Sequence, residues 1–303
     1  MERIPASLYD LYQQYPWLHY RPDSEADYLP PNYYDKVLKP YTFGGKSDLE
    51  FFLADTEDKF NPPTDNLLEM GCGSGRATDA LLNSGIGFRS LDLVDISHDM
   101  VAETSEKYVG IPEISVVESD TLDYLEATSK LYSYAYSLWG FSYSVHHHMN
   151  QKGIRAGKKH SEEVITKFLT QNLTPSGSMF IVHPDILSNE QRIIKSLRQP
   201  AVAKTKDRQS SSKRLLDSLL AELEKQGLVT VTCKHLQGDP IRYSSTEEAL
   251  EIFLNFHLHG SLNISRRLPA AIETLKQKFA EYKQGEEILI APGCFNYSVI
   301  KQG

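Results

Sequence analysis

The feature that most constrains this 303-residue chain is a glycine pattern, E-x-G-x-G-x-G, that begins at Glu69 inside an apolar run. The run at residues 67–70 is typical of a buried strand, and residues 76–82 continue with helical spacing. Glycines at such a strand-to-helix turn let backbone N–H groups approach a ligand, because no side chain stands in the way. A dinucleotide fingerprint needs Gly or Ala where this chain has Arg76, so the pattern indicates a nucleotide cofactor other than NAD.

Two further apolar runs also end in an acidic residue. In the segment 89–97 an apolar run ends at Asp95, which lies 20 residues beyond Gly75, where a carboxylate can accept hydrogen bonds from both ribose hydroxyls. Asp120 ends the third run, at residues 114–120. A purely structural alternative, in which both aspartates only cap the following helices, is weaker because three acids stand at three successive strand ends.

Together these motifs resemble those of the class I S-adenosylmethionine (SAM)-dependent methyltransferases, most strongly over residues 66–147. The resemblance implies an α/β fold, a Rossmann-like seven-stranded sheet with helices on both faces and an antiparallel last strand. It implies SAM as the cofactor, lying over the carboxyl ends of the strands. The cofactor-binding residues that it implies are Glu69, Gly71, Gly73, Gly75, Asp95, Ile96, Asp120, Thr121, Ser137, Trp139, Tyr33 and Tyr41.

The family pattern is incomplete in the fourth apolar run, residues 131–139, which lacks the family's early aspartate. The C-terminal half is distantly similar to histamine N-methyltransferase-like enzymes. The expected organisation is an N-terminal aromatic lid segment, residues 1–60, followed by a catalytic domain, residues 61–303, with helical insertions near 186–215 and 240–290. Within it we expect a turn at residues 172–178, a mobile polar loop at 203–213 and a final strand at 295–300.

The lid segment is unusually rich in aromatic residues: Tyr9, Tyr12, Tyr15, Trp17, Tyr20, Tyr28, Tyr33, Tyr34, Tyr41 and Phe43. Aromatic faces attract cations and exclude water, which suits a sulfonium ligand. We therefore expect residues 1 to about 45 to be mobile without SAM and ordered with it. The alternative is that these rings only pack the segment onto the sheet.

Catalytic candidates follow the fourth run, at residues 139–148. A neutral imidazole of His146 or His147 could take a proton from the attacking group, and Tyr34 of the lid is the third candidate. Neighbouring side chains diverge in direction, so the three adjacent histidines cannot share one pocket and no metal site is expected. His183, His257 and His259 could also reach the cavity, but a structural role is favoured for each of them.

Composition limits the kinds of partner that this chain is expected to bind. The net charge of −8 argues against nucleic acid, and no apolar stretch reaches the 18 residues of a membrane span. Three separated cysteines fit reduced thiols in a cytoplasmic protein.

The sequence thus predicts a SAM-dependent methyltransferase with a small-molecule acceptor. The mixed aromatic and acidic character of the segments expected around the site favours an amine, methylated by in-line displacement. Two alternatives are a SAM enzyme that cyclises its cofactor or transfers the aminocarboxypropyl arm, and a noncatalytic SAM-binding partner protein.

Overall fold

The computed structural model describes residues 6–18, 31–57, 59, 65–198, 208–258 and 268–303. The chain divides into two compact units. Unit 1 comprises residues 1–41, 186–208 and 237–293, and unit 2 comprises residues 42–185, 209–236 and 294–303.

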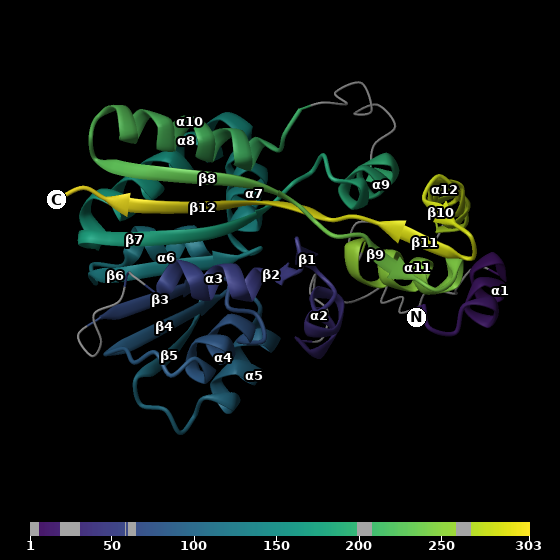
Figure 1. Cartoon of the computed structure of the whole chain (residues 1–303), viewed down its shortest axis with the longest axis horizontal. Helices are drawn as coiled ribbons and strands as arrows, with labels where there is room; N and C mark the ends of the chain where they lie inside the picture. Colours follow the sequence, from purple (N-terminus) through teal and green to yellow (C-terminus); the bar gives the residue numbers. More distant parts are fainter. Residues whose placement is uncertain (1–5, 19–30, 58, 60–64, 199–207, 259–267) are drawn as a thin grey trace. The chain divides into compact units, whose positions relative to one another are not determined.

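Unit 2 holds a seven-stranded sheet and its flanking helices (Figure 1). Its elements are β1 (Thr42–Phe43), β2 (Lys46–Ser47), α3 (Asp48–Thr56), β3 (Asn66–Met70), α4 (Arg76–Asn83), β4 (Ser90–Asp95), α5 (His98–Lys107), β5 (Ile114–Glu118), α6 (Thr121–Ala127), β6 (Tyr132–Leu138), α7 (Phe141–Lys152), α8 (Ile154–Lys167), the π-helical turn η1 (Phe168–Asn172), β7 (Leu173–Pro184), α10 (Ser211–Lys225), β8 (Val229–Gln237) and β12 (Gly293–Lys301). The last residue of β8, Gln237, and the first residue of β12, Gly293, are assigned to unit 1.

The strand order is β5-β4-β3-β6-β7-β12-β8. Strands β3 to β7 pair in parallel, and β12 runs antiparallel to β7. The predicted seven-stranded α/β fold with an antiparallel last strand is confirmed. The chain order reverses at β3, which has β4 on one side and β6 on the other, and ligands of open α/β sheets bind outside the carboxyl ends of the strands at such a point.

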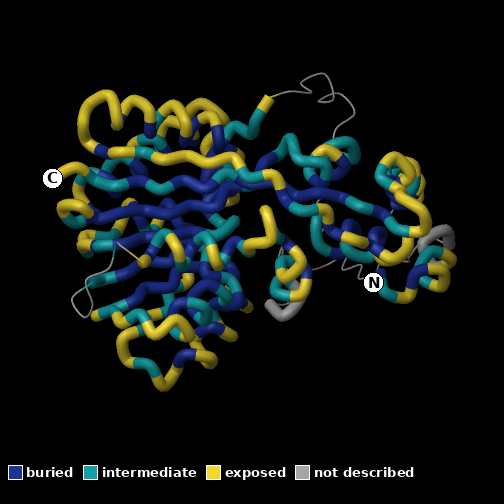
Figure 2. Tube along the Cα trace, viewed as in Figure 1, coloured by how far each residue is buried: buried dark blue, intermediate teal, exposed yellow. Residues whose placement is uncertain are grey.

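Helices cover both faces of this sheet. On one face the buried apolar side chains of α6, α7, α8 and α10 join those of the strands in one core cluster. On the other face Phe52 of α3 lies against Tyr136 and Phe180, with ring centroids 4.5 and 6.3 Å apart. Figure 2 shows the result: the inner strands β3, β4, β6 and β7 are largely buried, whereas the edge strand β8 and parts of the helices are exposed. The loops that follow the strands form the carboxyl edge of the sheet.

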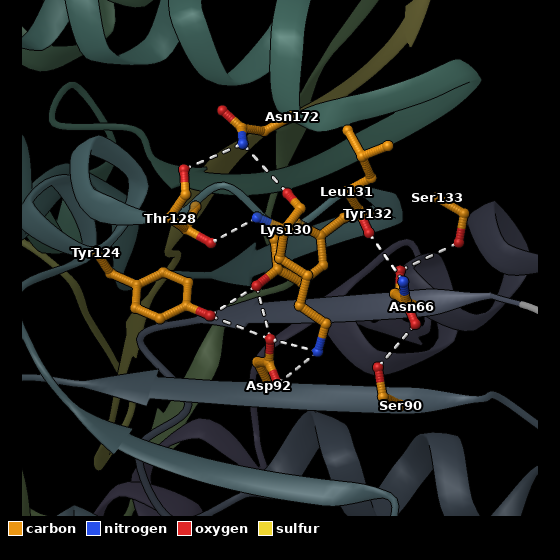
Figure 3. A network of polar contacts seen from close by, with 10 residues as sticks. All are labelled: Asn66, Ser90, Asp92, Tyr124, Thr128, Lys130, Leu131, Tyr132, Ser133 and Asn172. Carbon is orange, nitrogen blue, oxygen red and sulfur yellow. Dashed lines mark hydrogen bonds and ion pairs between the residues drawn. The ribbon is translucent and has the colours of Figure 1, made fainter.

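The amino edge of the sheet is held by a separate polar network (Figure 3). Asp92 of β4 is buried, and its carboxylate accepts hydrogen bonds from the Tyr132 hydroxyl at 2.6 Å, the Tyr124 hydroxyl at 3.1 Å and the Lys130 ammonium at 2.8 Å. Asn66 joins β3 to the chain before β6 through the Leu131 carbonyl, 3.0 Å away. This network fixes strand ends that face away from the glycine loop.

Two expectations about local structure were wrong. The predicted turn at residues 172–178 lies largely within β7, because the strand begins at Leu173 and absorbs extra residues in a register shift opposite Tyr132 and Tyr134, with Ser176 in the left-handed region at φ 60°. The predicted loop at 203–213 ends earlier, because the Ser210 side chain caps a helix that begins at Ser211. Residues 199–207 lie outside the described part of the chain.

Unit 1 contains the remaining elements. These are α1 (Ala6–Gln14), α2 (Pro31–Leu38), α9 (Asn189–Arg198), β9 (Ile241–Tyr243), α11 (Thr246–Ile252), the π-helical turn η3 (Phe253–His257), α12 (Leu268–Ala280), β10 (Lys283–Gln284) and β11 (Glu287–Ile290). The three strands form an antiparallel sheet in the order β10-β11-β9.

N-terminal aromatic residues pack within unit 1. The indole nitrogen of Trp17 donates to Glu247 of α11 at 3.1 Å, and the Tyr34 ring meets Phe256 edge-on with centroids 5.3 Å apart. The Tyr41 hydroxyl donates to the buried Glu190 carboxylate, which also lies 3.4 Å from Nε2 of His257. Burial raises the pKa of Glu190, but the His257 charge and hydrogen bonds outweigh it and leave that pKa below its usual value. The side chains of Tyr9 and Tyr33, and residues Tyr20, Tyr28 and His259, lie outside the described part.

Candidate functional site

The loop between β3 and α4 has the backbone conformation that its glycines predict. Gly71, Gly73 and Gly75 all lie in the left-handed region, at φ 74°, 53° and 79°. Gly71 packs against Gly140, where an added Cβ would come within 3.1 Å of the Gly140 Cα. Beside Gly73, by contrast, there is open space. The first and second glycine positions therefore differ: one is needed for close packing, and the other borders room for a ligand.

Helix α5 holds the outer side of this loop. The hydroxyl of Thr104, the ammonium of Lys107 and the hydroxyl of Tyr108 donate to the carbonyl oxygens of Gly73, Ser74 and Gly75, respectively, at 2.8, 2.9 and 2.9 Å. The three side chains are spaced i, i+3, i+4 and so share one helix face. That spacing is the signal in the sequence for these contacts, which were not predicted from it. These three hydrogen bonds engage the carbonyl groups of the loop and tie it to α5 and the residue that follows it.

Asp95, at the end of β4, is joined to the same loop. Its Oδ2 accepts from the Gly73 N–H at 2.8 Å, and its Oδ1 accepts from the Ser97 N–H at 2.9 Å. Burial raises the pKa of Asp95 above its usual value, while the hydrogen bonds from Ser97, Gly73 and Ile96 act in the opposite direction. Each carboxylate oxygen has a second lone pair, so both can still accept a hydroxyl. The neighbouring Ile96 is 38% exposed, which leaves an apolar side chain available beside this acid.

Glu69 lies deeper than Asp95. It is buried within β3 and accepts hydrogen bonds from the Thr78 hydroxyl of α4 and, at 3.1 Å, the Tyr136 hydroxyl of β6. Burial raises its pKa to about 7 despite these two donors. In the structure Glu69 connects three elements beneath the glycine loop.

Asp120 combines a cap with other contacts. Its Oδ1 accepts from the Leu122 N–H at 2.8 Å and so caps α6, and it also accepts from the Ser144 hydroxyl at 2.6 Å. Thr121, next in the chain, is buried as the first residue of that helix. The capping alternative therefore describes one oxygen of Asp120. It does not describe Asp95, since Ser97 caps α5.

The chain after β6 passes directly over the glycine loop. Ser137 donates to the Met70 carbonyl at 2.6 Å and accepts from the Phe141 N–H at 3.0 Å, so it ties β6 to β3 and to α7. Trp139 adopts a left-handed conformation, φ 71°, which is uncommon for a bulky residue and marks a constrained turn. Its ring stacks on Phe43, with centroids 6.3 Å apart and planes inclined by 27°.

An ion pair missed by sequence reasoning supports that turn. The carboxylate of Asp48, at the start of α3, pairs with both terminal nitrogens of Arg76 and accepts from the indole nitrogen of Trp139 at 2.6 Å. A Ser47-x-x-Glu50 capping box at the start of α3 was the available signal for this helix.

The three adjacent histidines of α7 face three different neighbours. His146 Nε2 lies 3.1 Å from the Ser212 hydroxyl, His147 Nε2 lies 2.8 Å from the Gln151 amide, and His148 Nε2 lies 3.0 Å from Asp120 Oδ1. They diverge in direction, as expected for a helix.

Ser212 also connects His146 to His183 at the end of β7. The Ser212 hydroxyl lies 3.0 Å from His183 Nε2, and His183 Nδ1 lies 2.9 Å from the Pro184 carbonyl oxygen. Burial lowers the pKa of His183 to about 4, so its ring is neutral near pH 7. Asp185 follows in the chain; its carboxylate accepts from the Gln209 amide at 2.7 Å and lies 2.8 Å from His235 Nε2.

Unit 2 therefore brings the glycine loop together with Asp95, Ile96, Ser137 and Trp139, and it also holds Glu69, Asp120, Thr121, His146 and His147. Tyr34 and Tyr41 belong to unit 1, as does the backbone of Tyr33. None of the three cysteines is in a disulfide, and within the described ranges no helix is long and apolar enough to cross a membrane.

Comparison with known proteins agrees with this geometry. A family model described as a methyltransferase domain matches residues 67–161. A malonyl-[acyl-carrier protein] O-methyltransferase 2 from Ilyobacter polytropus is 32% identical over 76 residues, which is 25% of this chain and 27% of that protein. The match thus spans about a quarter of that relative's length.

Solved structures resemble the fold. The YcgJ protein from Bacillus subtilis superposes with a TM-score of 0.52 at 14% identity, over 84% of this chain and 98% of that one. A SAM-dependent methyltransferase from Geobacter sulfurreducens, solved with S-adenosyl-L-homocysteine, superposes with a TM-score of 0.51 at 15% identity, over 93% of this chain and 100% of that one. At these identities the similarity supports the fold.

Proposed function

We propose that this chain is a class I SAM-dependent methyltransferase that transfers the methyl group of SAM to a small-molecule amine by in-line displacement, with His146 as the proton acceptor. SAM supplies a methyl group already activated by its positive sulfur. The protein's own part is then to orient the acceptor, to exclude water and to hold or move a proton.

The residues around the glycine loop fit this cofactor. The open space beside Gly73 leaves room for a ligand, and each carboxylate oxygen of Asp95 has a second lone pair for a ribose hydroxyl. We propose that Ile96 contacts the adenine ring and that Asp120 accepts from its amino group through the carboxylate. Glu69, Ser137 and Thr121 act beneath them as supports, since their side chains are buried.

The observation that carries the catalytic proposal is the chain His146–Ser212–His183. His183 Nδ1 donates to the Pro184 carbonyl, so its Nε2 accepts the Ser212 proton. The Ser212 oxygen then accepts from His146 Nε2, which leaves Nδ1 of His146 with the lone pair. This order follows because burial keeps His183 neutral. A fixed tautomer defines which ring nitrogen has the lone pair that a proton acceptor uses.

The negative charge next to the end of β7 favours an amine as the methyl acceptor. A neutral amine becomes a cation when it is methylated, and a nearby carboxylate stabilises that charge. Asp185 supplies a buried carboxylate near the hydrogen-bonded residues His146, Ser212 and His183. It accepts from the amide of Gln209, and the next residue, Ser210, has its hydroxyl 3.0 Å from that of Ser212.

Product analysis tests the reaction. Purified protein is incubated with SAM alone and with a panel of amines and phenols, and products are identified by mass spectrometry. We expect S-adenosylhomocysteine and a methylated amine in equal amounts. Methylthioadenosine without acceptor would instead show internal displacement, and methylation confined to phenols would exclude the amine.

Substitution of the histidine tests the base. His146→Ala should lower turnover by roughly 10²- to 10⁴-fold while SAM affinity stays unchanged, because a base acts in the transition state. The pH profile should lose the limb assigned to this imidazole. The same loss in His147→Ala alone would move the role to His147, and full activity in both variants would leave alignment and desolvation as the mechanism.

A further inference from the structure

A second polar cluster lies where α6, α7 and α8 meet, and the proposed reaction does not use it. The imidazole rings of His148 and His160 face each other with centroids 4.9 Å apart and planes inclined by 33°. One potential ligand atom from each of His148, His160 and Asp123 lies within 4.8 Å of the others.

The packing of α7 and α8 creates this juxtaposition. A Cβ at Gly157 would lie 2.5 Å from the Met149 Cα, so only glycine allows the two helices to approach so closely. His160 follows one turn later and is thereby held opposite His148. Both histidines come from helices whose positions are set by the core cluster.

The ring nitrogens of these histidines are incompletely satisfied. His148 is 1% exposed; its Nε2 contacts Asp120 at 3.0 Å, while its Nδ1 is buried without a hydrogen-bond partner among the described residues. His160 Nε2 is also buried without a hydrogen bond within that part of the chain, with Glu126 Oε2 3.7 Å away. A buried polar atom without a hydrogen bond needs an explanation, and a bound ion is one that two such imidazoles can share.

We propose that this cluster binds a divalent transition-metal ion, Zn²⁺ before others, through His148, His160 and Asp123. Two imidazoles and a carboxylate suit Zn²⁺, whereas Mg²⁺ and Ca²⁺ prefer oxygen ligands alone. Metal-binding histidines usually donate their second ring nitrogen to a carboxylate, as His148 Nε2 does to Asp120 at 3.0 Å; Asp123 Oδ1 lies 3.5 Å from the same nitrogen. Glu126, one turn beyond Asp123 on α6, lies close enough to His160 to complete the set.

This site is distinct from the three-histidine site that the sequence excluded. Of the adjacent histidines it uses only His148, and its other ligands come from α6 and α8. A bound ion would cross-link three helices and so stabilise the folded protein. The proposal does not depend on the methyl transfer reaction, because neither its ligands nor its readout involves SAM.

Metal titration of the whole, untagged chain tests the proposal. After treatment with a chelator and its removal, Zn²⁺ is added and followed by calorimetry and by metal analysis after dialysis, with Co²⁺ as a spectroscopic probe. We expect one ion per chain and a higher melting temperature with Zn²⁺. Retention of no Zn²⁺ after dialysis would overturn the site.

Variants decide where the ion binds. His160→Ala and Asp123→Asn should weaken Zn²⁺ binding at least about 10-fold. His98→Ala is the matched control, because it removes an exposed imidazole that is paired with a carboxylate, Glu118, 2.8 Å away. Its Zn²⁺ binding should be unchanged. Equal Zn²⁺ binding by His160→Ala and the unaltered chain would show adventitious surface binding and would reject the proposal. Circular dichroism without metal, equal to that of the unaltered chain, shows that His160→Ala still folds. If it does not fold, His160→Gln repeats the test.

Discussion

Asp92 and Asp95 belong to the same strand, yet their surroundings assign them opposite roles. Asp95 contacts the glycine loop, whereas Asp92 belongs to the polar network at the other edge of the sheet. We predict that Asp95→Ala weakens SAM binding about 10- to 100-fold per lost hydrogen bond, since a charge-assisted bond contributes about 1.5–3 kcal/mol. Calorimetry with the folded variant measures this. Unchanged affinity would remove Asp95 from the cofactor site.

Asp92→Asn should produce the complementary result. The substitution removes the charge that Lys130 pairs with and disturbs two tyrosine hydrogen bonds, so we expect a loss of about 2–4 kcal/mol in the free energy of unfolding. SAM affinity of the folded fraction should not change. Denaturant unfolding and calorimetry provide the two measurements. A variant as stable as the unaltered chain would show that the network contributes little.

Glu69 predicts a pH dependence of stability. Its folded-state pKa of about 7 exceeds the ordinary 4.5, so the folded protein holds this proton in the window from pH 4.5 to 7 and loses stability as pH rises through it. Glu69→Gln removes this titration. Relative to the unaltered chain, the free energy of unfolding of the variant should therefore be about 2 kcal/mol higher at pH 8 than the same comparison gives at pH 5. Urea unfolding at both values tests it. Parallel curves for the two proteins would contradict a buried titrating Glu69.

At the scale of elements, the sheet was predictable where each strand had its own signal. Apolar runs ended by acids located β3, β4 and β5, and glycines located the turn into α4. The start of β7 was missed because its register shift depends on pairing with β6, which no local pattern records. Helix α3 was not predicted, although the Ser47-x-x-Glu50 capping box marks its start. Of the candidate site, the residues on strand ends were predictable, whereas Asp48, Ser212 and the α5 side chains depend on tertiary contacts.

The crossing of α7 and α8 gives a prediction at this scale. Gly157→Ala should destabilise the protein by about 1–3 kcal/mol through overpacking, although alanine favours an isolated helix by about 1 kcal/mol. Gly110→Ala is the control, because a Cβ at Gly110 meets nothing within 4 Å and its φ is not in the left-handed region. Thermal unfolding compares the two. Equal melting temperatures would mean that the helices separate at little cost.

At the scale of the whole molecule, the lid hypothesis remains to be tested. It predicts that SAM slows amide exchange in α2 and at Tyr41, because a closing segment is ordered by its ligand. Mass spectrometry of hydrogen exchange with and without SAM resolves these residues. Equal protection in both states would make their tyrosines packing residues of unit 1, as their contacts with Phe256 and Glu190 already allow.

The division of the chain into two units limits how unit 1 can be exchanged between related proteins or redesigned. The backbone passes between the units at residues 41/42, 185/186, 208/209, 236/237 and 293/294. Unit 1 is thus written in three separate stretches of the gene and cannot be exchanged between relatives by a single recombination event. Any change of specificity carried by unit 1 must accumulate by substitutions within those stretches, or by coordinated replacement of all three.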